Sequence, residues 1–305
     1  MASSRTSTSS RTAVRTGAAM PAKRLEVRKT YKLYIAGAFP RSESGRSYPV
    51  TAPNGQVVAR PARASRKDLR DAVRAARSAW TGWAGTTAYK RGQVLYRVAE
   101  LIEGRREQFA EELSRLGVRR ADREVDASID RWVWYAGWSD KVHQVMGTVN
   151  PVAGPYFNFT FPEPTGVVGI VAPEEPALLG LVSRLAPVVV SGNVAVLLAS
   201  EFKPLPAVTL SEVLATSDVP GGVINVLTGY KAELIPWLAS HMDVNAIDLS
   251  GSPEELVAGA EEAAAANVKR TVRDGAVDYF DDSAQSPYAI SDFLEMKTVW
   301  HPMGA

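Results

Sequence analysis

The sequence predicts an α/β protein with a parallel sheet. From Gly166 onward, short apolar segments rich in β-branched residues alternate with segments of helical periodicity. The strand-like segments are GVVGIV at residues 166–171, VAVLL at 194–198, VINVL at 223–227 and AIDLS at 246–250. Such alternation places helices on both faces of the sheet and a ligand crevice beyond the carboxyl ends of the strands.

The composition fits a soluble globular protein. The chain has 305 residues, of which 46% are hydrophobic and 22% are charged, and it has no cysteine. We therefore expect no disulfides and a cytoplasmic location. Residues 1–24 hold five basic residues and no acidic one, so the rest of the chain is close to neutral. This balance excludes the basic surface that is typical of nucleic-acid-binding proteins.

Residues 1–28 are predicted to form a disordered basic tail. The tail is rich in serine, threonine and arginine, and it lacks the apolar core of a secretory signal. A transit peptide shares this basic, acid-poor composition, but disorder is the favoured interpretation.

The most apolar stretch, residues 176–200, has the length of a membrane span, which is about 20 residues. We instead expect a buried helix over residues 178–190, a Ser-Gly-Asn turn and a buried strand over residues 194–199. The reason is that four residues interrupt the stretch, namely Arg184, Pro187, Gly192 and Asn193.

The N-terminal half is predicted to be mainly helical. Short strands are expected within residues 31–40 and 47–65. Ser65 then resembles an N-cap with an acid, Asp68, in the first turn of a helix. Three further helices are expected around residues 94–102, 109–116 and 121–145. The predicted buried face of the last one consists of Val125, Ile129, Trp132, Val133 and Ala136.

Five segments carry a resemblance to a known family. They are WYAGWSDK at residues 134–141, GPYFNFTFPEPTGVVG at 154–169, SGN at 191–193, PGGVINVLTG at 220–229 and NVKR at 267–270. In this order and at this spacing they resemble the aldehyde dehydrogenase superfamily over most of residues 31–270. The resemblance implies a Rossmann-like parallel sheet with flanking helices, a projecting β oligomerisation arm, and a vestigial site for NAD, with no other cofactor expected.

The chemistry of that family depends on a cysteine thiolate, which attacks the aldehyde before hydride leaves. This chain has no cysteine. On our alignment, the Trp-Asn pair of the family stretch GVVGxIxPWNxPL becomes Glu174 and Glu175, so the asparagine that donates to the oxyanion is also lost. The resemblance therefore implies no catalytic residue in this chain. We expect the two glutamates to form a solvated turn.

The resemblance implies four candidate cofactor-binding residues. Glu201 matches a glutamate that holds the adenosine ribose, while Leu198 replaces the lysine of the same motif. Gly229 matches a glycine near the pyrophosphate, and Gly251 with Ser252 opens a later helix whose amides favour phosphate. Turn geometry, together with a capping box formed by Ser252 and the glutamate three residues later, would explain these residues without a ligand.

The sequence departs from the family after Arg270. The family continues into its catalytic domain, whereas TVRDGAVDYFDD follows here, with Asp274 at the position of a cofactor-contacting glutamate. KTVWHP at residues 297–302 then resembles the terminal oligomerisation arm. We therefore expect that the catalytic domain was deleted internally while both ends were kept.

The predicted organisation has three parts besides the missing catalytic domain. They are the tail 1–28, a dinucleotide-binding-type domain of residues 29–146 and 162–275, and an oligomerisation hairpin and terminal arm at residues 147–161 and 285–305. In the family, hairpin and arm pair across subunits by strand addition. Free strand edges invite aggregation, so a retained arm favours a partner. The alternative is that the arm packs only on its own subunit.

Two functions remain open. The first is a catalytically inactive subunit that acts as structural or regulatory partner of a full-length aldehyde dehydrogenase, or of a second copy, through hairpin 147–161 and arm 298–305. The alternative is an NAD-dependent aldehyde oxidoreductase component whose nucleophile is supplied by a partner. No metal site is expected, because His143, His241 and His301 lack paired ligand spacing. No membrane partner is expected either, because the apolar stretch 176–200 is interrupted by polar and turn residues.

Overall fold

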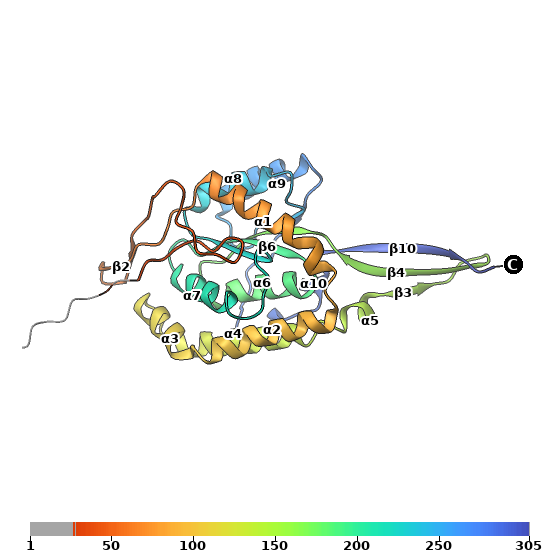
Figure 1. Ribbon diagram of the computed structural model, residues 1–305, viewed down its shortest axis with the longest axis horizontal. Coiled ribbons are helices and arrows are strands. Elements are labelled where there is room, and N and C mark those ends of the chain that lie inside the picture. Colours follow the sequence, from red (N-terminus) through yellow and green to blue (C-terminus); the bar gives the residue numbers. More distant parts are fainter. Residues whose placement is uncertain (1–26, 28, 305) are drawn as a thin grey trace, which may run out of the picture.

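The computed structural model describes residue 27 and residues 29–304. Figure 1 shows these residues as an α/β body from which a long β arm projects at one end. The prediction of a disordered tail over residues 1–28 lies almost wholly outside the described residues.

The predicted parallel sheet is confirmed. Its five strands lie in the order β7-β6-β5-β8-β9, and every neighbouring pair is parallel. The strands are β5 (Val167–Val171), β6 (Val194–Leu198), β7 (Ile224–Leu227), β8 (Ala246–Asp248) and β9 (Arg270–Val272). The chain first winds from β5 towards β7 and then crosses back to β8. The topological switch point, where such sheets bind ligands, therefore lies between β5 and β8.

Helices cover both faces of this sheet (Figure 1). One face carries α1 (Arg66–Ala84), α8 (Lys231–Ser240) and α9 (Glu254–Ala265). The other carries α6 (Leu179–Val190) and α7 (Leu205–Leu214), against which an outer layer packs, formed by α2 (Ala88–Glu103), α3 (Arg106–Arg115) and α4 (Ala121–Ala136). This four-layer arrangement buries the sheet on both sides, which explains its uninterrupted apolar strands.

The apolar stretch of residues 176–200 folds as the sequence predicts. It forms α6, a turn and β6, and all of α6 and β6 is buried. Gly192 has a φ of +96°, a conformation that glycine adopts without strain, and it allows the sharp turn between helix and strand. No helix in the described part of the chain is long and apolar enough to cross a membrane.

Two local predictions have different outcomes. The capping box of α1 is confirmed, since the Ser65 hydroxyl accepts from the Asp68 amide at 3.3 Å and the Asp68 carboxylate accepts from the Ser65 amide at 2.8 Å. The helix predicted over residues 121–145 was too long. It ends at Gly137, and α5 (Val142–Met146) follows after a turn. Val133, predicted to be buried, is 40% exposed.

The expected N-terminal strands are short. Only β1 (Val50–Thr51) and β2 (Val57–Ala59) form a ladder in the described part of this region. Tyr34 makes an isolated antiparallel bridge to Val226, which extends the edge of the parallel sheet beside β7.

The arm is a three-stranded antiparallel sheet with the order β10-β4-β3. Its strands are β3 (Thr148–Asn150), β4 (Tyr156–Pro164) and β10 (Leu294–Pro302). The terminal strand pairs with β4 of its own chain along its full length, from Leu294 opposite Pro164 to Pro302 opposite Tyr156. The remaining segments between β9 and β10 are the short helices η1 (Asp282–Ala284) and α10 (Tyr288–Ser291).

Candidate functional site

The candidate site is the edge of the parallel sheet at which the strands end. The loops that follow β5, β6, β7 and β8 meet there, because all four strands run in the same direction. We call this edge the crevice and define it by Glu174, Glu201, Gly229, Lys231 and Gly251.

Glu174 is held inside the crevice and does not form the predicted solvated turn. Its carboxylate accepts from the Ser200 hydroxyl at 2.6 Å and from the amides of Glu201 and Phe202 at 3.1 and 3.2 Å. The prediction failed because these donors belong to the loop after β6, which the local sequence cannot place. The neighbouring Glu175 does extend into solvent, where it pairs with Lys203.

Lys231 forms an ion pair with Glu174. Its side chain is 2% exposed, and its ammonium also donates to the carbonyl oxygens of Ala172 at 2.7 Å and Gly251 at 2.8 Å. Burial alone would raise the pKa of Glu174, but the ammonium of Lys231 outweighs burial and lowers this pKa below its ordinary value. The carboxylate is therefore ionised at neutral pH. This pair links the ends of β5, β7 and β8.

Glu201, the predicted ribose-binding residue, lies in the crevice but contacts its own chain. Its carboxylate accepts at 2.9 Å from the backbone amide of Lys231, the first residue of α8. A helix start offers free amides to an anion. Here a carboxylate of the same chain occupies one of them.

The two predicted glycines are explained by close packing. Gly229 has a φ of +153°, and a Cβ there would lie 3.2 Å from the Ala64 amide nitrogen. A Cβ on Gly251 would lie 2.2 Å from the Ala172 carbonyl oxygen. Both positions thus require glycine for the turns themselves, whether or not a ligand binds nearby.

Ser252 does not form the capping box with Glu255. Helix α9 begins at Glu254, and Pro253 occupies the N-cap position without a side-chain cap. Ser252 therefore lies one residue before the N-cap position of α9. Its hydroxyl is buried and has no hydrogen-bond partner among the described residues.

Asp274 lies near the crevice on the segment that leads towards the arm. It pairs with Arg184 of α6, whose guanidinium also donates to Asp248 at 2.5 Å. Burial opposes the charge of Arg184, yet the two carboxylates raise its pKa. Arg131 of α4 fastens the same segment by donating to the carbonyl oxygens of Tyr279 at 2.9 Å and Ala284 at 3.1 Å.

Sequence reasoning identified Glu201, Gly229 and Gly251 at this edge but missed the role of Lys231 and Arg184. The sequence did contain a signal for the ion pair, namely two oppositely charged residues in the loops after β5 and β7. A glutamate after β5 and a lysine after β7 have opposite charges at strand ends that share one edge. Within the described residues, no cluster of histidine and acidic side chains could hold a metal ion.

Chemically, the crevice offers carboxylates and one ammonium that are engaged with each other or with the backbone. The chain contains no thiol. A hydroxyl nucleophile would require a neighbouring free base. The Ser200 hydroxyl instead donates to an ionised carboxylate that also neutralises Lys231.

Comparison with known proteins agrees with this architecture. Human retinal dehydrogenase 2 is 34% identical over 258 residues, which make up 82% of this chain and 49% of that protein. Aldehyde dehydrogenase family 2 member B4, mitochondrial, from Arabidopsis thaliana is 34% identical over 230 residues, or 73% of this chain and 42% of that protein. The chain thus spans about half the length of these curated relatives.

The solved structures that match this chain are likewise covered over about half of their length. An NAD+ complex structure of aldehyde dehydrogenase from Bacillus cereus has a TM-score of 0.74 at 26% identity and covers 80% of this chain and 50% of that one. HpcC from Thermus thermophilus has a TM-score of 0.76 at 30% identity, and the match covers 80% of this chain and 48% of HpcC. The model of the aldehyde dehydrogenase family matches residues 39–275. On sequence, fold and motif order, this chain belongs to the aldehyde dehydrogenase family.

Proposed function

We propose that this chain is a non-catalytic member of its family that assembles through the β arm with a full-length aldehyde dehydrogenase. The observation that carries the proposal is the projecting arm, which the chain completes by pairing β10 with β4 and whose large aromatic side chains stay exposed. This pairing is complete along nine-residue strands, although only residues 273–293 separate β10 from the last strand of the parallel sheet.

The missing nucleophile supports a non-catalytic role. The chain has no cysteine, and Glu175 stands where our alignment places the oxyanion-binding asparagine. Loss of one oxyanion donor alone reduces turnover by about two to three orders of magnitude. A negative charge at that position would also repel the developing oxyanion. We expect the purified chain not to reduce NAD or NADP with aliphatic or aromatic aldehydes.

The nucleotide site is proposed to be vestigial. A dinucleotide pyrophosphate needs free amides or cations at the strand ends. Glu201 already holds the first amide of α8, and Glu174 already neutralises Lys231. Two carboxylates in the crevice would repel a phosphate. These residues therefore do not fit NAD, which argues against the alternative of an oxidoreductase component with a borrowed nucleophile.

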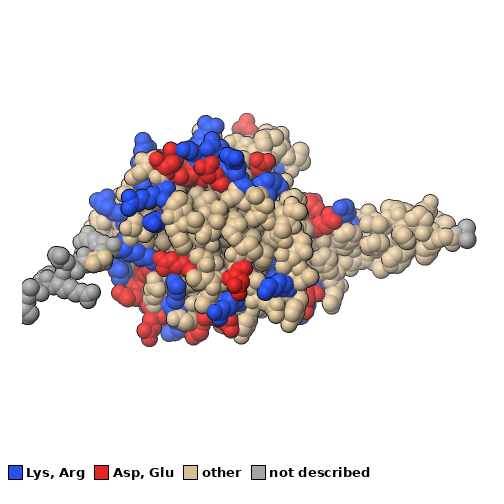
Figure 2. Space-filling model, viewed as in Figure 1, with Lys and Arg blue, Asp and Glu red and all other residues tan. Residues whose placement is uncertain are grey.

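The arm supports assembly. On the face that Figure 2 shows, charged side chains gather on the body and at the base of the arm, while the rest of the arm is almost free of charge. Three of its large aromatic side chains are well exposed: Tyr156 by 41%, Phe157 by 43% and Trp300 by 59%. Aromatic residues without charge are typical of the desolvated centre of an interface. The outer edges of β3 and β10 also offer unpaired backbone groups for strand addition.

Co-expression with a full-length family member of the same genome, followed by size-exclusion chromatography with light scattering, tests the proposal. We expect one complex that contains both chains. Removal of residues 298–305 should release the partner and leave the parallel sheet folded, because all strands of that sheet precede residue 273. A monodisperse monomer that does not bind the full-length chain would contradict the proposal.

Calorimetry with NAD at about 1 mM tests the vestigial site separately. We expect no heat of binding. Binding that Glu201→Ala weakens would overturn this part and leave the assembly proposal untouched.

A further inference from the structure

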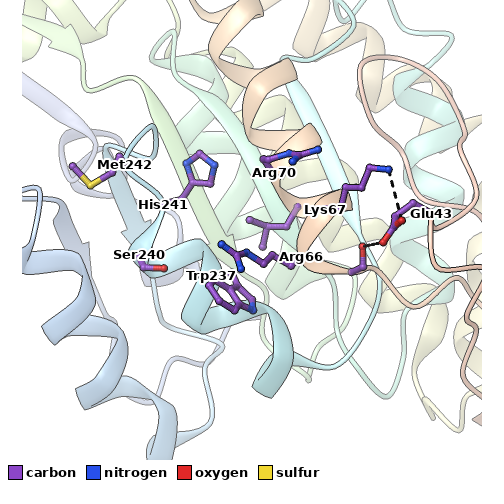
Figure 3. Close-up of a pocket in the computed structure, with 10 residues that line it drawn as sticks. Glu43, Arg66, Lys67, Arg70, Trp237, Ser240, His241 and Met242 are labelled. Carbon is purple, nitrogen blue, oxygen red and sulfur yellow. Dashed lines mark hydrogen bonds and ion pairs between the residues drawn. The ribbon is translucent and has the colours of Figure 1, made fainter.

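A cavity between the start of α1 and the end of α8 is separate from both the crevice residues and the arm. It measures about 660 Å³, within the usual range of small-molecule pockets, about 300–1,000 Å³. Figure 3 shows its lining side chains, which come from the loop before α1, from α1 and from the end of α8. The lining consists of Glu43, Ser65, Arg66, Lys67, Leu69, Arg70, Trp237, Ser240, His241 and Met242.

The charged lining of this cavity is mainly cationic. Arg66, Lys67 and Arg70 share this lining with a single carboxylate, that of Glu43, and Arg70 also pairs with Asp71 outside the lining at 3.1 Å. The Lys67–Glu43 pair has a separation of 3.7 Å between side chains that are 54% and 41% exposed, so it neutralises little. Arg66 forms no ion pair with any carboxylate of the described residues. An anion that enters the cavity therefore meets an uncompensated guanidinium.

The wall formed by the end of α8 carries two large apolar side chains beside Ser240 and His241. Trp237 is 41% exposed and Met242 is 66% exposed. The guanidinium of Arg66 lies over the indole ring of Trp237, 3.7 Å from its centroid (Figure 3). Stacking uses one face of the guanidinium, whereas its N–H groups lie in its plane. These groups donate to no described residue and are available to a ligand.

The adjoining cavity shares Ser65, Arg66 and Trp237 and also has three cationic side chains in its lining against one carboxylate, that of Glu233. There Arg63 donates to Glu233 at 3.0 Å and stacks on Tyr230, so its charge is already satisfied. The cavity between α1 and α8 differs in that Met242 adds a second large apolar side chain beside Trp237 and does not line the adjoining one.

We propose that the cavity between α1 and α8 binds a small organic anion with an aromatic body and a single carboxylate or sulfonate group. The anionic group accepts hydrogen bonds from Arg66 and from Nη1 of Arg70, because Asp71 engages the Nε and Nη2 of Arg70. The aromatic body packs against Trp237 and Met242. Planar guanidinium groups suit two-oxygen acceptors of this kind. The proposal uses neither the crevice nor the arm, so it does not depend on the proposed function.

A pair of fluorescent probes tests this site in the full chain. Anilinonaphthalene sulfonate carries the required anion, and N-phenylnaphthylamine has the same rings without it. We expect the sulfonate to bind the native protein and Arg66→Glu or Arg70→Glu to weaken its binding about tenfold or more, as for loss of a charge-assisted hydrogen bond. Trp237→Ala should also weaken it.

Arg74→Glu is the matched control. Arg74 is an exposed residue of the same helix that does not line the cavity, and its replacement changes the net charge equally. We expect it to change sulfonate binding less than about twofold, because exposed charges outside the site are screened. The neutral probe should bind the native protein and the three arginine variants alike, and only Trp237→Ala should weaken it. Equal loss in Arg66→Glu and Arg74→Glu, or no sulfonate binding by the native protein, would overturn the proposal.

Discussion

The charged side chains of the crevice make contacts within the chain, whereas the aromatic side chains of the arm are exposed to solvent. In the crevice, Glu174, Glu201 and Lys231 all contact one another or nearby backbone groups. On the arm, Tyr156 and Trp300 contact each other with ring centroids 5.7 Å apart but remain well exposed. The charged side chains at the strand ends are thus engaged within the chain, while the aromatic side chains of the arm remain exposed. This difference favours assembly over catalysis.

The largest expected effect comes from placing a charge on the arm. Trp300→Glu should raise the dissociation constant of the assembly about hundredfold, since a buried aromatic anchor is lost and an unpaired carboxylate is desolvated. Sedimentation velocity over a concentration series measures this. Tyr89→Glu on α2 is the control, because Tyr89 is even more exposed, at 69%, but lies on the body. Equal effects of both changes would remove the distinction between arm and body.

The next effect concerns the stability of the crevice. Lys231→Met should lower the free energy of unfolding by about 2 kcal/mol, because it leaves the Glu174 carboxylate without its cation. The Glu174 side chain is 30% exposed, so solvent screens part of the interaction and the loss of stability is smaller than for a fully buried ion pair.

The double variant Lys231→Met, Glu174→Gln should recover most of that loss. Urea unfolding of the four proteins gives the coupling between the two residues. Additive losses would mean that the pair contributes nothing through its contact. Assembly should be unchanged in all four.

The same pair predicts a pH dependence. The pKa of Glu174 is lower in the folded chain than the ordinary value of 4.5. Its contribution is therefore fully present above pH 4.5 and is lost as the pH falls through the folded pKa. Unfolding between about pH 3 and 6 should be less pH-dependent in Glu174→Gln, and identical slopes would argue against the ion pair.

The smallest effect is expected at Glu201. Its carboxylate holds the first amide of α8, so Glu201→Ala should lower stability by about 1 kcal/mol without any ligand present. Glu262→Ala, at an exposed position of α9, should change stability by less than about 0.5 kcal/mol. If Glu201→Ala changes the free energy of unfolding no more than Glu262→Ala does, the contact between Glu201 and the Lys231 amide does not cap the helix.

The sequence predicts most of the fold because the decisive signals are local. Strand patterns, the Ser65–Asp68 cap and the turn at Gly192 depend on residues within a few positions of one another. The end of α4 was misplaced because apolar periodicity continues past Gly137 into α5. The end of such a helix is set by the turn that follows it, and the apolar periodicity on either side of the turn does not reveal it.

The chemistry of the crevice could be predicted only in part. Gly229 and Gly251 follow from the motif, but the Glu174–Lys231 pair joins loops that are far apart in the chain. Which of several charged loop residues meet depends on side-chain directions at the sheet edge, and periodicity carries no information about these. The projecting arm could be expected from KTVWHP, whereas its nine-position pairing with β4 required the structure.

The junction between β9 and β10 has a consequence for how such chains gain or lose a domain. Arg270 of β9 donates to the carbonyl oxygen of Leu294 at 2.7 Å, so the two ends of residues 273–293 lie side by side. A segment with adjacent ends can be replaced by a longer or shorter one at little cost in loop-closure entropy, about 0.6 kcal/mol for each doubling of length. The body and arm thus form a frame that tolerates insertion. A foreign domain placed after Gly275, an open position of this loop, should leave that frame intact.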